Sequence, residues 1–250
     1  MHLSIIIPVF NEVKLLPKIF FKIFKETKKI NKEIIIIDDN SNDGTKEWLS
    51  GLKNRFNLID IKNNKLIFSK RKKGNLQIFL KEKNEGKGSA VKIGLKQSSK
   101  EIIVIQDADM EYNPAEFRWL LQPILDDRAD VVYGSRFSSP DHAVSPGWHR
   151  AGNQFITRCF NFVIRLRFTD VETCYKMFRR EVIQELAPRL KENRFGIEIE
   201  MTAKLARRGD IRFFERPISY ARRSYAEGKK IGWRDGVRAL WRILRYGFGK

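Results

Sequence analysis

The sequence predicts an α/β protein with a single doubly wound, mostly parallel sheet flanked by helices. Short β-branched runs such as Ile34–Ile37 and Ile102–Ile105 are typical of strands buried on both faces of such a sheet. These runs alternate with segments whose apolar residues recur at helical spacing. Polar and acidic residues directly follow several runs, at the strand ends where open α/β sheets bind ligands. The length of 250 residues suits one large domain with at most a small appendage.

The first part of the chain alternates expected strands and helices. Leu3–Val9 is an apolar strand, and residues 11–28 repeat apolar side chains at the spacing of a helix. A polar turn precedes the second helix, and Ser41 or Asn42 is expected to cap it. The other expected elements are strand 34–37, helix 42–56, strand 77–81, helix 89–97, strand 102–106, helix 114–125 beginning at Pro114, and strand 130–133.

A strongly basic insertion at about residues 62–76 interrupts this alternation. It includes Lys65, Lys70, Arg71, Lys72 and Lys73. We expect an exposed loop or hairpin between core elements. Two interpretations remain open, a solvated insertion and a contact with acidic lipid or an acidic partner.

The part of the chain after Arg136 is mainly helical in its pattern. The expected elements are helix 150–167, helices 182–190 and 197–207, strand 211–215 and helix 233–248. The last helix places Trp233, Trp241 and Tyr246 among several arginines, which is typical of an amphipathic helix at a membrane interface. The alternative is a helix that packs on the core and exposes a basic face.

The composition narrows the classes of partner and compartment. A formal net charge of +19 indicates an anionic partner, such as nucleic acid, a phosphorylated substrate or an acidic membrane, unless it reflects a general lysine bias. Two cysteines, Cys159 and Cys174, suggest no disulfide framework and a reducing compartment. No apolar run reaches the roughly 18 residues of a membrane span. The run before Pro8 is too short for a signal peptide.

The most informative motif is Asp107-Ala108-Asp109, directly after strand 102–106. Two carboxylates one residue apart at a strand end suit a hard divalent cation. Mg²⁺ and Mn²⁺ prefer oxygen ligands and commonly share their coordination sphere with substrate phosphates. Glu111 adds a third carboxylate nearby. The motif therefore predicts metal-assisted handling of a diphosphate, and a solvated turn is the alternative.

Three other strand-end segments suit the remaining parts of a nucleotide-diphosphate sugar. In Pro8–Glu12 the proline fixes the backbone beside a ligand, and Phe10 can pack on a flat base. In Asp38–Thr45 a carboxylate can accept a hydrogen bond from a base N–H. In Asn84–Gly88 two glycines flank a lysine at a helix start, where backbone N–H groups and the helix dipole favour phosphate.

In order and spacing these segments resemble those of family 2 glycosyltransferases with the GT-A fold. The resemblance is closest to the branch of dolichol-phosphate mannose synthases and polyprenyl-phosphate glycosyltransferases, and it covers nearly the whole chain except the basic insertion. The segments that carry it are SIIIPVFNE (4–12), IDDNSNDGT (37–45), NEGKG (84–88), QDAD (106–109), GSR (134–136), DVETCYK (170–176) and RSYAEGKKIGW (223–233).

The resemblance implies a role for each matching residue. Asp107 and Asp109 would bind Mg²⁺ or Mn²⁺ with the donor diphosphate, and Glu111 would join them directly or through water. The phosphates of donor or acceptor would face Arg136, Arg223 and Lys229. The residues implied in donor nucleotide binding are Pro8, Phe10, Glu12, Asp39, Gly86, Lys87, Asp107 and Ala108.

The implied activity is inverting, metal-dependent transfer of a hexose from a GDP- or UDP-sugar to a polyprenyl or dolichyl phosphate. Asp109 and Arg136 would take part in the transfer. A phosphate acceptor is already an anion, whereas a hydroxyl of a saccharide, lipid or protein needs a base, for which Asp170 or Glu172 are the candidates. Other classes kept open are a nucleic-acid-binding module and a non-catalytic membrane scaffold.

The same resemblance implies the organisation and location of the protein. Residues 1–230 would form the catalytic domain, and residues 231–250 would form an amphipathic helical region in contact with an anionic membrane. We expect a cytoplasmic enzyme on the membrane face that binds no nucleic acid. The donor base, the sugar and the oligomeric state are left open by the sequence.

Overall fold

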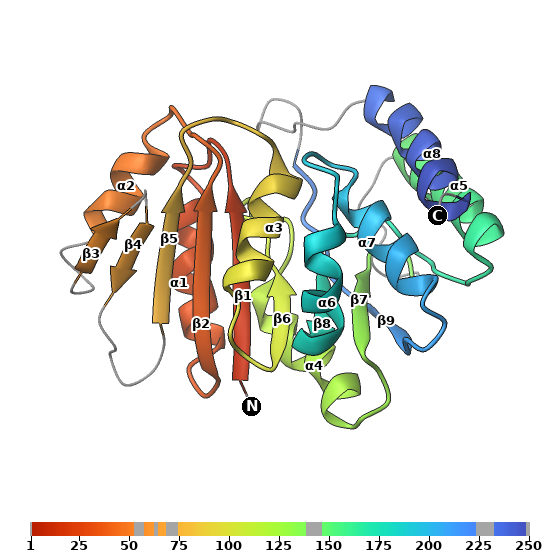
Figure 1. The fold of residues 1–250 in the computed structure, drawn as a ribbon, viewed down its shortest axis with the longest axis horizontal. Coiled ribbons are helices and arrows are strands. Elements are labelled where there is room, and N and C mark those ends of the chain that lie inside the picture. The colour runs from red at the N-terminus through yellow and green to blue at the C-terminus, as the bar shows by residue number, and fades with distance from the viewer. Residues whose placement is uncertain are drawn as a thin grey trace.

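The computed structural model describes residues 2–52, 58–62, 65–68, 75–138, 147–223 and 233–248 (Figure 1). The strands are β1 (His2–Val9), β2 (Asn31–Asp38), β3 (Leu58–Lys62), β4 (Lys65–Phe68), β5 (Asn75–Leu80), β6 (Ile102–Ile105), β7 (Val131–Ser135), β8 (Lys176–Arg179) and β9 (Phe213–Pro217). The α-helices are α1 (Leu16–Glu26), α2 (Thr45–Gly51), α3 (Lys87–Gln97), α4 (Phe117–Leu125), α5 (Gly147–Ile164), α6 (Arg180–Leu186), α7 (Ile197–Ala206) and α8 (Trp233–Phe248).

The described strands form one sheet in the order β3-β4-β5-β2-β1-β6-β8-β7-β9. At its centre, β1 pairs in parallel with β2 and β6, and β2 pairs in parallel with β5. Ile5, Ile6 and Ile7 are fully buried because both faces of these strands are covered. The parallel centre brings the carboxyl ends of β1, β2, β5 and β6 to one edge of the sheet.

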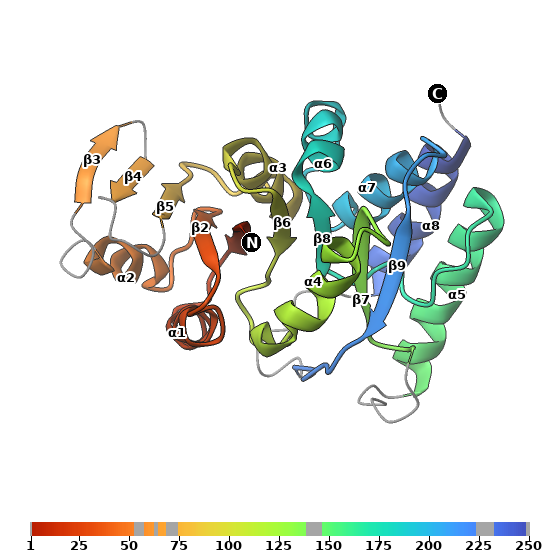
Figure 2. The ribbon, with the colours of Figure 1, turned by 90° about the horizontal axis from the view of Figure 1, so that it is seen from below.

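Helices cover both faces of the sheet, as the doubly wound pattern predicts (Figure 2). Helices α1 and α4 pack on one face, and α3, α6 and α7 pack on the other. Two hydrophobic clusters result, one on each face. Helices α5 and α8 also contribute to the second cluster, and α8 lies beside α5 and contacts α7 (Figures 1 and 2). The predicted α/β fold class is confirmed.

Strand β8 is the element that the sequence did not predict. It runs antiparallel between β6 and β7, and with the antiparallel pairs β3–β4 and β4–β5 it makes the sheet mixed. Its sequence, Lys-Met-Phe-Arg, is short and begins with a charged residue, so it lacks the apolar run of the other strands. Tertiary packing explains it, because Lys176 is fully buried, donates to the Val171 carbonyl at 2.9 Å and lies over the Tyr133 ring.

Four expected helix starts differ from the structure by three or more residues: α4 begins at Phe117 after a 3-10 turn at Pro114–Glu116, α5 begins at Gly147 rather than residue 150, and the other two are α1 and α2. Helix α1 begins at Leu16 rather than near residue 11, because Asn11 has a positive φ of 54° and Pro17 lies in the first turn. Helix α2 begins after Gly44, which has a φ of 99°, and neither Ser41 nor Asn42 caps it. These two residues bond to the β1 turn instead, where Asn11 contacts both.

The basic insertion contributes a hairpin, one of the two forms expected for it. Strands β3 and β4 pair antiparallel, and β4 pairs antiparallel with β5. The hairpin extends the edge of the sheet that lies farthest from α5 and α8 (Figure 1). Residues 63–64 and 69–74 of the insertion lie outside the described part.

Helix α8 is amphipathic, as expected, and it has one buried and one exposed apolar face. Ala239, Ile243 and Tyr246 are buried in the second hydrophobic cluster. The large apolar residues exposed on the other face are Val237, Trp241, Leu244 and Phe248. Within the described ranges, no helix has the length and apolar character needed to cross a membrane.

Candidate active site

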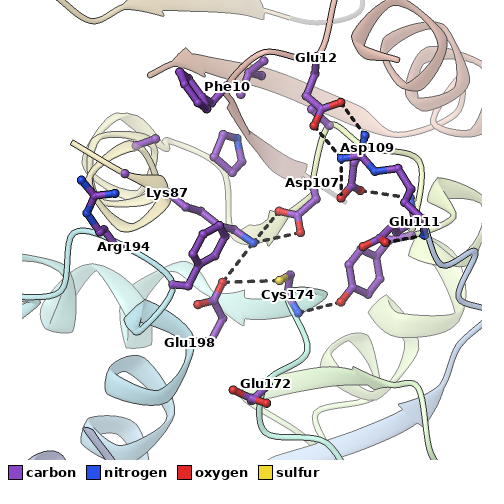
Figure 3. Close-up of a pocket in the computed structure, with 18 of the residues that line it drawn as sticks. Phe10, Glu12, Lys87, Asp107, Asp109, Glu111, Glu172, Cys174, Arg194 and Glu198 are labelled. Atoms are coloured by element: carbon purple, nitrogen blue, oxygen red, sulfur yellow. Dashed lines mark hydrogen bonds and ion pairs between the residues drawn. The ribbon is translucent and has the colours of Figure 1, made fainter. Parts of the chain in front are cut away.

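A cavity of about 660 Å³ lies at the carboxyl ends of the central parallel strands. It is lined by residues from the loops after β1, β2, β5 and β6, and by residues from α3, α5, α7 and α8. Figure 3 shows the side chains that converge on it. Parallel strands carry their following loops to the same edge of the sheet, which explains why the motifs predicted from sequence meet here.

The motif after β6 places three carboxylates at the cavity, those of Asp107, Asp109 and Glu111. The turn between them closes through a positive φ at Met110 and a hydrogen bond of 3.1 Å from the Glu111 N–H to Asp109 Oδ1. Burial, together with the charges of Asp107 and Glu111, raises the pKa of Asp109 to about 8. The cluster therefore holds more negative charge than its surroundings stabilise.

Two cations partly balance these carboxylates. The Lys87 ammonium lies 2.7 Å from Asp107 Oδ1 and 3.1 Å from Glu198 Oε1. Burial alone would lower the pKa of Lys87, but the charges of Asp107, Cys174 and Glu198 raise it well above its usual value. The Arg223 guanidinium donates to both oxygens of Glu12, at 2.7 and 3.0 Å, and lies 3.5 Å from Asp109.

The carboxylates suit a divalent cation that is shared with a substrate. Among the described residues, no group of three or more His, Cys, Asp or Glu side chains is arranged to hold a metal ion alone. Mg²⁺ is usually bound by one or two carboxylates together with substrate phosphates, so a dedicated cage is not required. The raised pKa of Asp109 indicates a site where an added positive charge is favourable.

The loop before α3 is fixed to the end of β2 through Asp39. One Asp39 oxygen accepts from the Lys81 ammonium at 2.5 Å and from the Glu85 N–H at 3.1 Å, and the other accepts from the Gly86 N–H at 2.7 Å. Gly86 has a φ of 102°, and a Cβ there would lie 2.5 Å from the Asn193 carbonyl. Only glycine therefore allows this close approach at the start of α3.

The two residues considered as a catalytic base lie in different surroundings. Asp170 is fully buried and accepts three hydrogen bonds from Arg136, from its backbone N–H at 3.1 Å, its Nε at 2.7 Å and its Nη2 at 2.8 Å. Glu172 also lines the cavity, and Figure 3 shows it on the side opposite Phe10 and Glu12. Burial, with the charges of Asp170 and Glu198, raises the pKa of Glu172 to about 7.

The segment 191–196 forms a wall of the cavity that sequence reasoning did not find. The Glu200 carboxylate accepts from the backbone N–H groups of Lys191 and Glu192. The Glu192 carboxylate in turn accepts from Arg242 Nε at 2.9 Å and Tyr246 Oη at 2.8 Å, both on α8. This segment therefore joins α7 and α8 to the first turn of α3, since the Asn193 carbonyl accepts from the Ser89 N–H.

Other cavity residues were also missed. They include Tyr112, Cys174, Arg194, Phe195, Glu198, Tyr220 and Arg222. One signal was present in the sequence, because Glu198 and Glu200 interrupt an otherwise apolar helix, and a buried carboxylate needs a partner. Cys174 lies in the segment DVETCYK, which carries part of the family resemblance, and the others carry no local pattern that marks them.

Most of the predicted site residues meet in this cavity. Those that line it are Pro8, Phe10, Glu12, Asp39, Gly86, Lys87, Asp107, Ala108, Asp109, Glu111, Arg136, Glu172 and Arg223. Asp170 lies beneath Arg136 and does not line it. Lys229 lies outside the described residues. The individual roles given to these residues stay predictions.

Residues 4–187 match the family described as Glycosyl transferase family 2. The chain belongs to this family. It is a glycosyltransferase, and the resemblance found in the sequence is confirmed. The family match covers the carboxylate motif, the loop before α3 and the Arg136–Asp170 pair.

Two curated relatives have named activities. The chain is 26% identical over 251 residues to UDP-N-acetylglucosamine--dolichyl-phosphate N-acetylglucosaminyltransferase of Methanococcus voltae, covering 98% of this chain and 96% of that protein. It is 28% identical over 137 residues to dolichol-phosphate mannosyltransferase of Pyrococcus furiosus, covering 55% of this chain and 34% of that protein. An uncharacterised protein of Methanocaldococcus jannaschii, MJ0544, is 24% identical over 237 residues, with 86% and 90% covered.

Solved structures share the fold. Glucosyl-3-phosphoglycerate synthase of Mycobacterium tuberculosis, in complex with Mn²⁺, UDP and phosphoglyceric acid, superposes with a TM-score of 0.68 at 16% identity. The match covers 99% of this chain and 78% of that one. The same enzyme in complex with Mg²⁺ and UDP gives a TM-score of 0.63 at 17% identity, with 98% and 79% covered. The sheet and its helical layers are therefore those of a GT-A glycosyltransferase.

Proposed function

We propose that this glycosyltransferase moves a hexose, with inversion and with a divalent metal, from a nucleotide-diphosphate sugar to a polyprenyl phosphate at a membrane surface. The observation that supports this most is the single cavity in which Asp107, Asp109 and Glu111 face a set of cations. Carboxylates, a metal and basic side chains together suit a site for two phosphorylated substrates. The relatives that use dolichyl phosphate support the same class of acceptor.

At the donor end, the chain's own residues would hold the nucleotide and its diphosphate. Phe10 would pack on the base, and the α3 N-terminus would donate backbone N–H groups to phosphate. Mg²⁺ or Mn²⁺ held by Asp107 and Asp109, with Glu111 close by, would neutralise charge on the departing diphosphate. Lys87 and Arg223, which now pair with carboxylates, lie where they would turn to phosphate once a metal takes those carboxylates.

At the acceptor end, a phosphate needs positioning rather than deprotonation. Arg136 lines the cavity and is held rigidly by Asp170, and Arg222, which is distant in the chain, lines the same cavity. The buried Nε atom of Arg222 has no hydrogen-bond partner among the described residues. Two guanidinium groups that face one cavity would bind an anionic acceptor in line with the donor sugar.

A hydroxyl acceptor is the second candidate, and Glu172 is the observation that favours it. Its carboxyl lines the cavity and has a pKa raised to about 7, which suits a general base near neutral pH. Asp170 suits this role less, because both of its oxygens already accept from Arg136.

The membrane contact is proposed for the exposed apolar residues of α5 and α8. These are Phe155, Phe162, Val237, Trp241, Leu244 and Phe248. Exposed arginines lie on the same two helices, among them Arg158, Arg238 and Arg245. Aromatic and aliphatic residues beside arginines match an anionic lipid surface.

Thermal unfolding of the purified protein with UDP or GDP, each with and without Mn²⁺, tests the donor site first. A ligand that binds only the folded state raises its melting temperature. We expect a metal-dependent rise with one of the two nucleotides, and no rise with either would contradict the donor assignment. Transfer from the matching nucleotide sugar to undecaprenyl phosphate, compared with a saccharide hydroxyl, then separates the two acceptor classes.

A further inference from the structure

Helices α5 and α8 pack tightly at one end and leave room for an added side chain at the other. A Cβ built on Gly247, near the end of α8, would lie 2.2 Å from Val163 Cγ1, so the helices touch tightly there. Among the described residues, a Cβ built on the exposed Gly152 of α5 would meet nothing within 4 Å. A Cβ built on Gly236 of α8 would meet, of the same residues, only Ile156 Cδ1 of α5, at 3.8 Å, which is an ordinary van der Waals contact. This looser packing lies where both helices line the cavity.

Packing does not require the two glycines at this open end. Glycine inside a helix costs about 0.5–1 kcal/mol relative to alanine, because it loses more backbone freedom on folding. A close helix contact can justify this cost, as it does at Gly247, but Gly152 and Gly236 have no such contact. What they share is that both line the cavity. Their lack of a side chain leaves this end of the cavity open.

The chemical character of the cavity changes toward these glycines. At the donor end it presents Lys87, Asp107 and Asp109, whereas the α5–α8 end is lined by Gly152, Asn153, Ile156 and Gly236. Phe155 and Val237, each next to one of these lining residues in sequence, are exposed on the outer surface. A ligand with a charged head and an apolar chain fits this gradient, with its head at the donor end and its chain between the helices.

We propose that Gly152 and Gly236 form the passage for the apolar chain of the acceptor, and that their small size determines that a long, bulky chain is accepted. This inference rests on the proposed function, since it assumes a lipid phosphate acceptor. It assigns a specificity role to two residues that contact neither the donor nor the carboxylate cluster. The phosphate of the same acceptor would lie against Arg136 and Arg222.

Variants Gly152→Leu and Gly236→Leu test the passage. A leucine at either position would meet no backbone atom of the described residues at its Cβ, and its side chain would narrow the α5–α8 end of the cavity. The matched control is Gly51→Leu, because Gly51 lies on α2, is exposed, does not line the cavity and also has no atom within 4 Å of a built Cβ. Initial rates are measured with undecaprenyl phosphate and with the much shorter geranyl phosphate, together with melting temperature and donor hydrolysis without acceptor.

We expect the two passage variants to raise KM for undecaprenyl phosphate by about tenfold or more, equivalent to about 1.4 kcal/mol of binding. KM for geranyl phosphate, the nucleotide-induced rise in melting temperature and donor hydrolysis should match Gly51→Leu. Unchanged KM for undecaprenyl phosphate in both variants would overturn the inference alone. Equal losses with both acceptors would also overturn it, because they indicate a general distortion. A wild-type enzyme that transfers to neither prenyl phosphate would overturn the proposed acceptor and the passage together.

Discussion

The buried pair of Arg136 and Asp170 allows a positioning role for Asp170 to be separated from a role as catalytic base. Asp170 is fully buried, and the Arg136 side chain is 12% exposed. Asp170→Asn keeps the shape of the side chain but removes its charge and offers an amide NH₂ where Arg136 needs an acceptor. Removing one partner of a buried ion pair costs about 3–5 kcal/mol, because the other charge remains buried without compensation.

Because asparagine retains one acceptor oxygen, we expect Asp170→Asn to lower the free energy of unfolding by about 3 kcal/mol, at the lower end of that range. Urea unfolding at neutral pH measures this, with an unchanged m-value showing that the same surface is exposed. Asp210→Asn is the matched control, since Asp210 pairs with Arg208 at the exposed surface and should give no resolvable change. Pairing Asp170→Asn with Arg136→Met should cost less than the two single changes added together.

The activity of Asp170→Asn separates the two roles. If Asp170 positions Arg136, transfer should fall together with acceptor affinity, and the pH profile of the remaining activity should keep its shape. If Asp170 were the base, the loss of stability would be the same, but kcat would collapse and the acidic limb of the pH profile would disappear. That second result would refute the reasoning above.

Three further predictions concern other parts of the site. Burial raises the pKa of Glu172 from 4.5 to about 7, so the wild type loses stability as pH rises from about 4.5 through about 7. Glu172→Gln should gain stability relative to wild type over that interval in urea unfolding and keep a constant advantage at higher pH, and a pH-independent difference across the interval would contradict this. Glu192→Gln should weaken nucleotide binding by about threefold to tenfold in titrations, because Glu192 ties α8 to the segment that holds the donor loop, and an unchanged Kd would exclude that coupling. Trp241→Ser combined with Phe162→Ser should weaken co-sedimentation with anionic vesicles by about tenfold or more, while the control Trp119→Ser, an exposed tryptophan on α4, should bind like wild type; equal binding by all three proteins would place the membrane contact elsewhere.

The strand ends are the part of the site that could be predicted from sequence. Pro8, Asp39, Gly86 and Asp107 each follow or lie beside a strand, and parallel strands must bring their carboxyl ends to one edge. The direction of the strands therefore converts local motifs into a shared cavity without detailed knowledge of packing. For the basic insertion, the sequence left a loop and a hairpin open. Its basic residues do not alternate clearly with apolar ones, so they do not distinguish a loop from an edge strand.

The carboxylate-binding cations were harder to predict. The Arg223 guanidinium reaches Glu12 from 211 residues away in the chain, and the Lys87 ammonium reaches Glu198 on α7. Such pairs depend on how the loops pack at the carboxyl ends of the strands. The spacing of residues in the sequence does not predict that packing. The unexpected strand β8 has the same origin, since it is held by its two neighbours and by the buried Lys176 rather than by an apolar run.

The sequence by itself determined the fold class, the family and most residues of the candidate site, because hydrophobic periodicity and the chemistry of strand ends are local properties that each segment carries alone. The tertiary structure decided how those residues pair, which of Asp170 and Glu172 lines the cavity, and how tightly α5 and α8 pack along their length. These features arise from contacts between distant segments. Their energies depend on burial and on the distance between charges, and both exist only once the chain has folded.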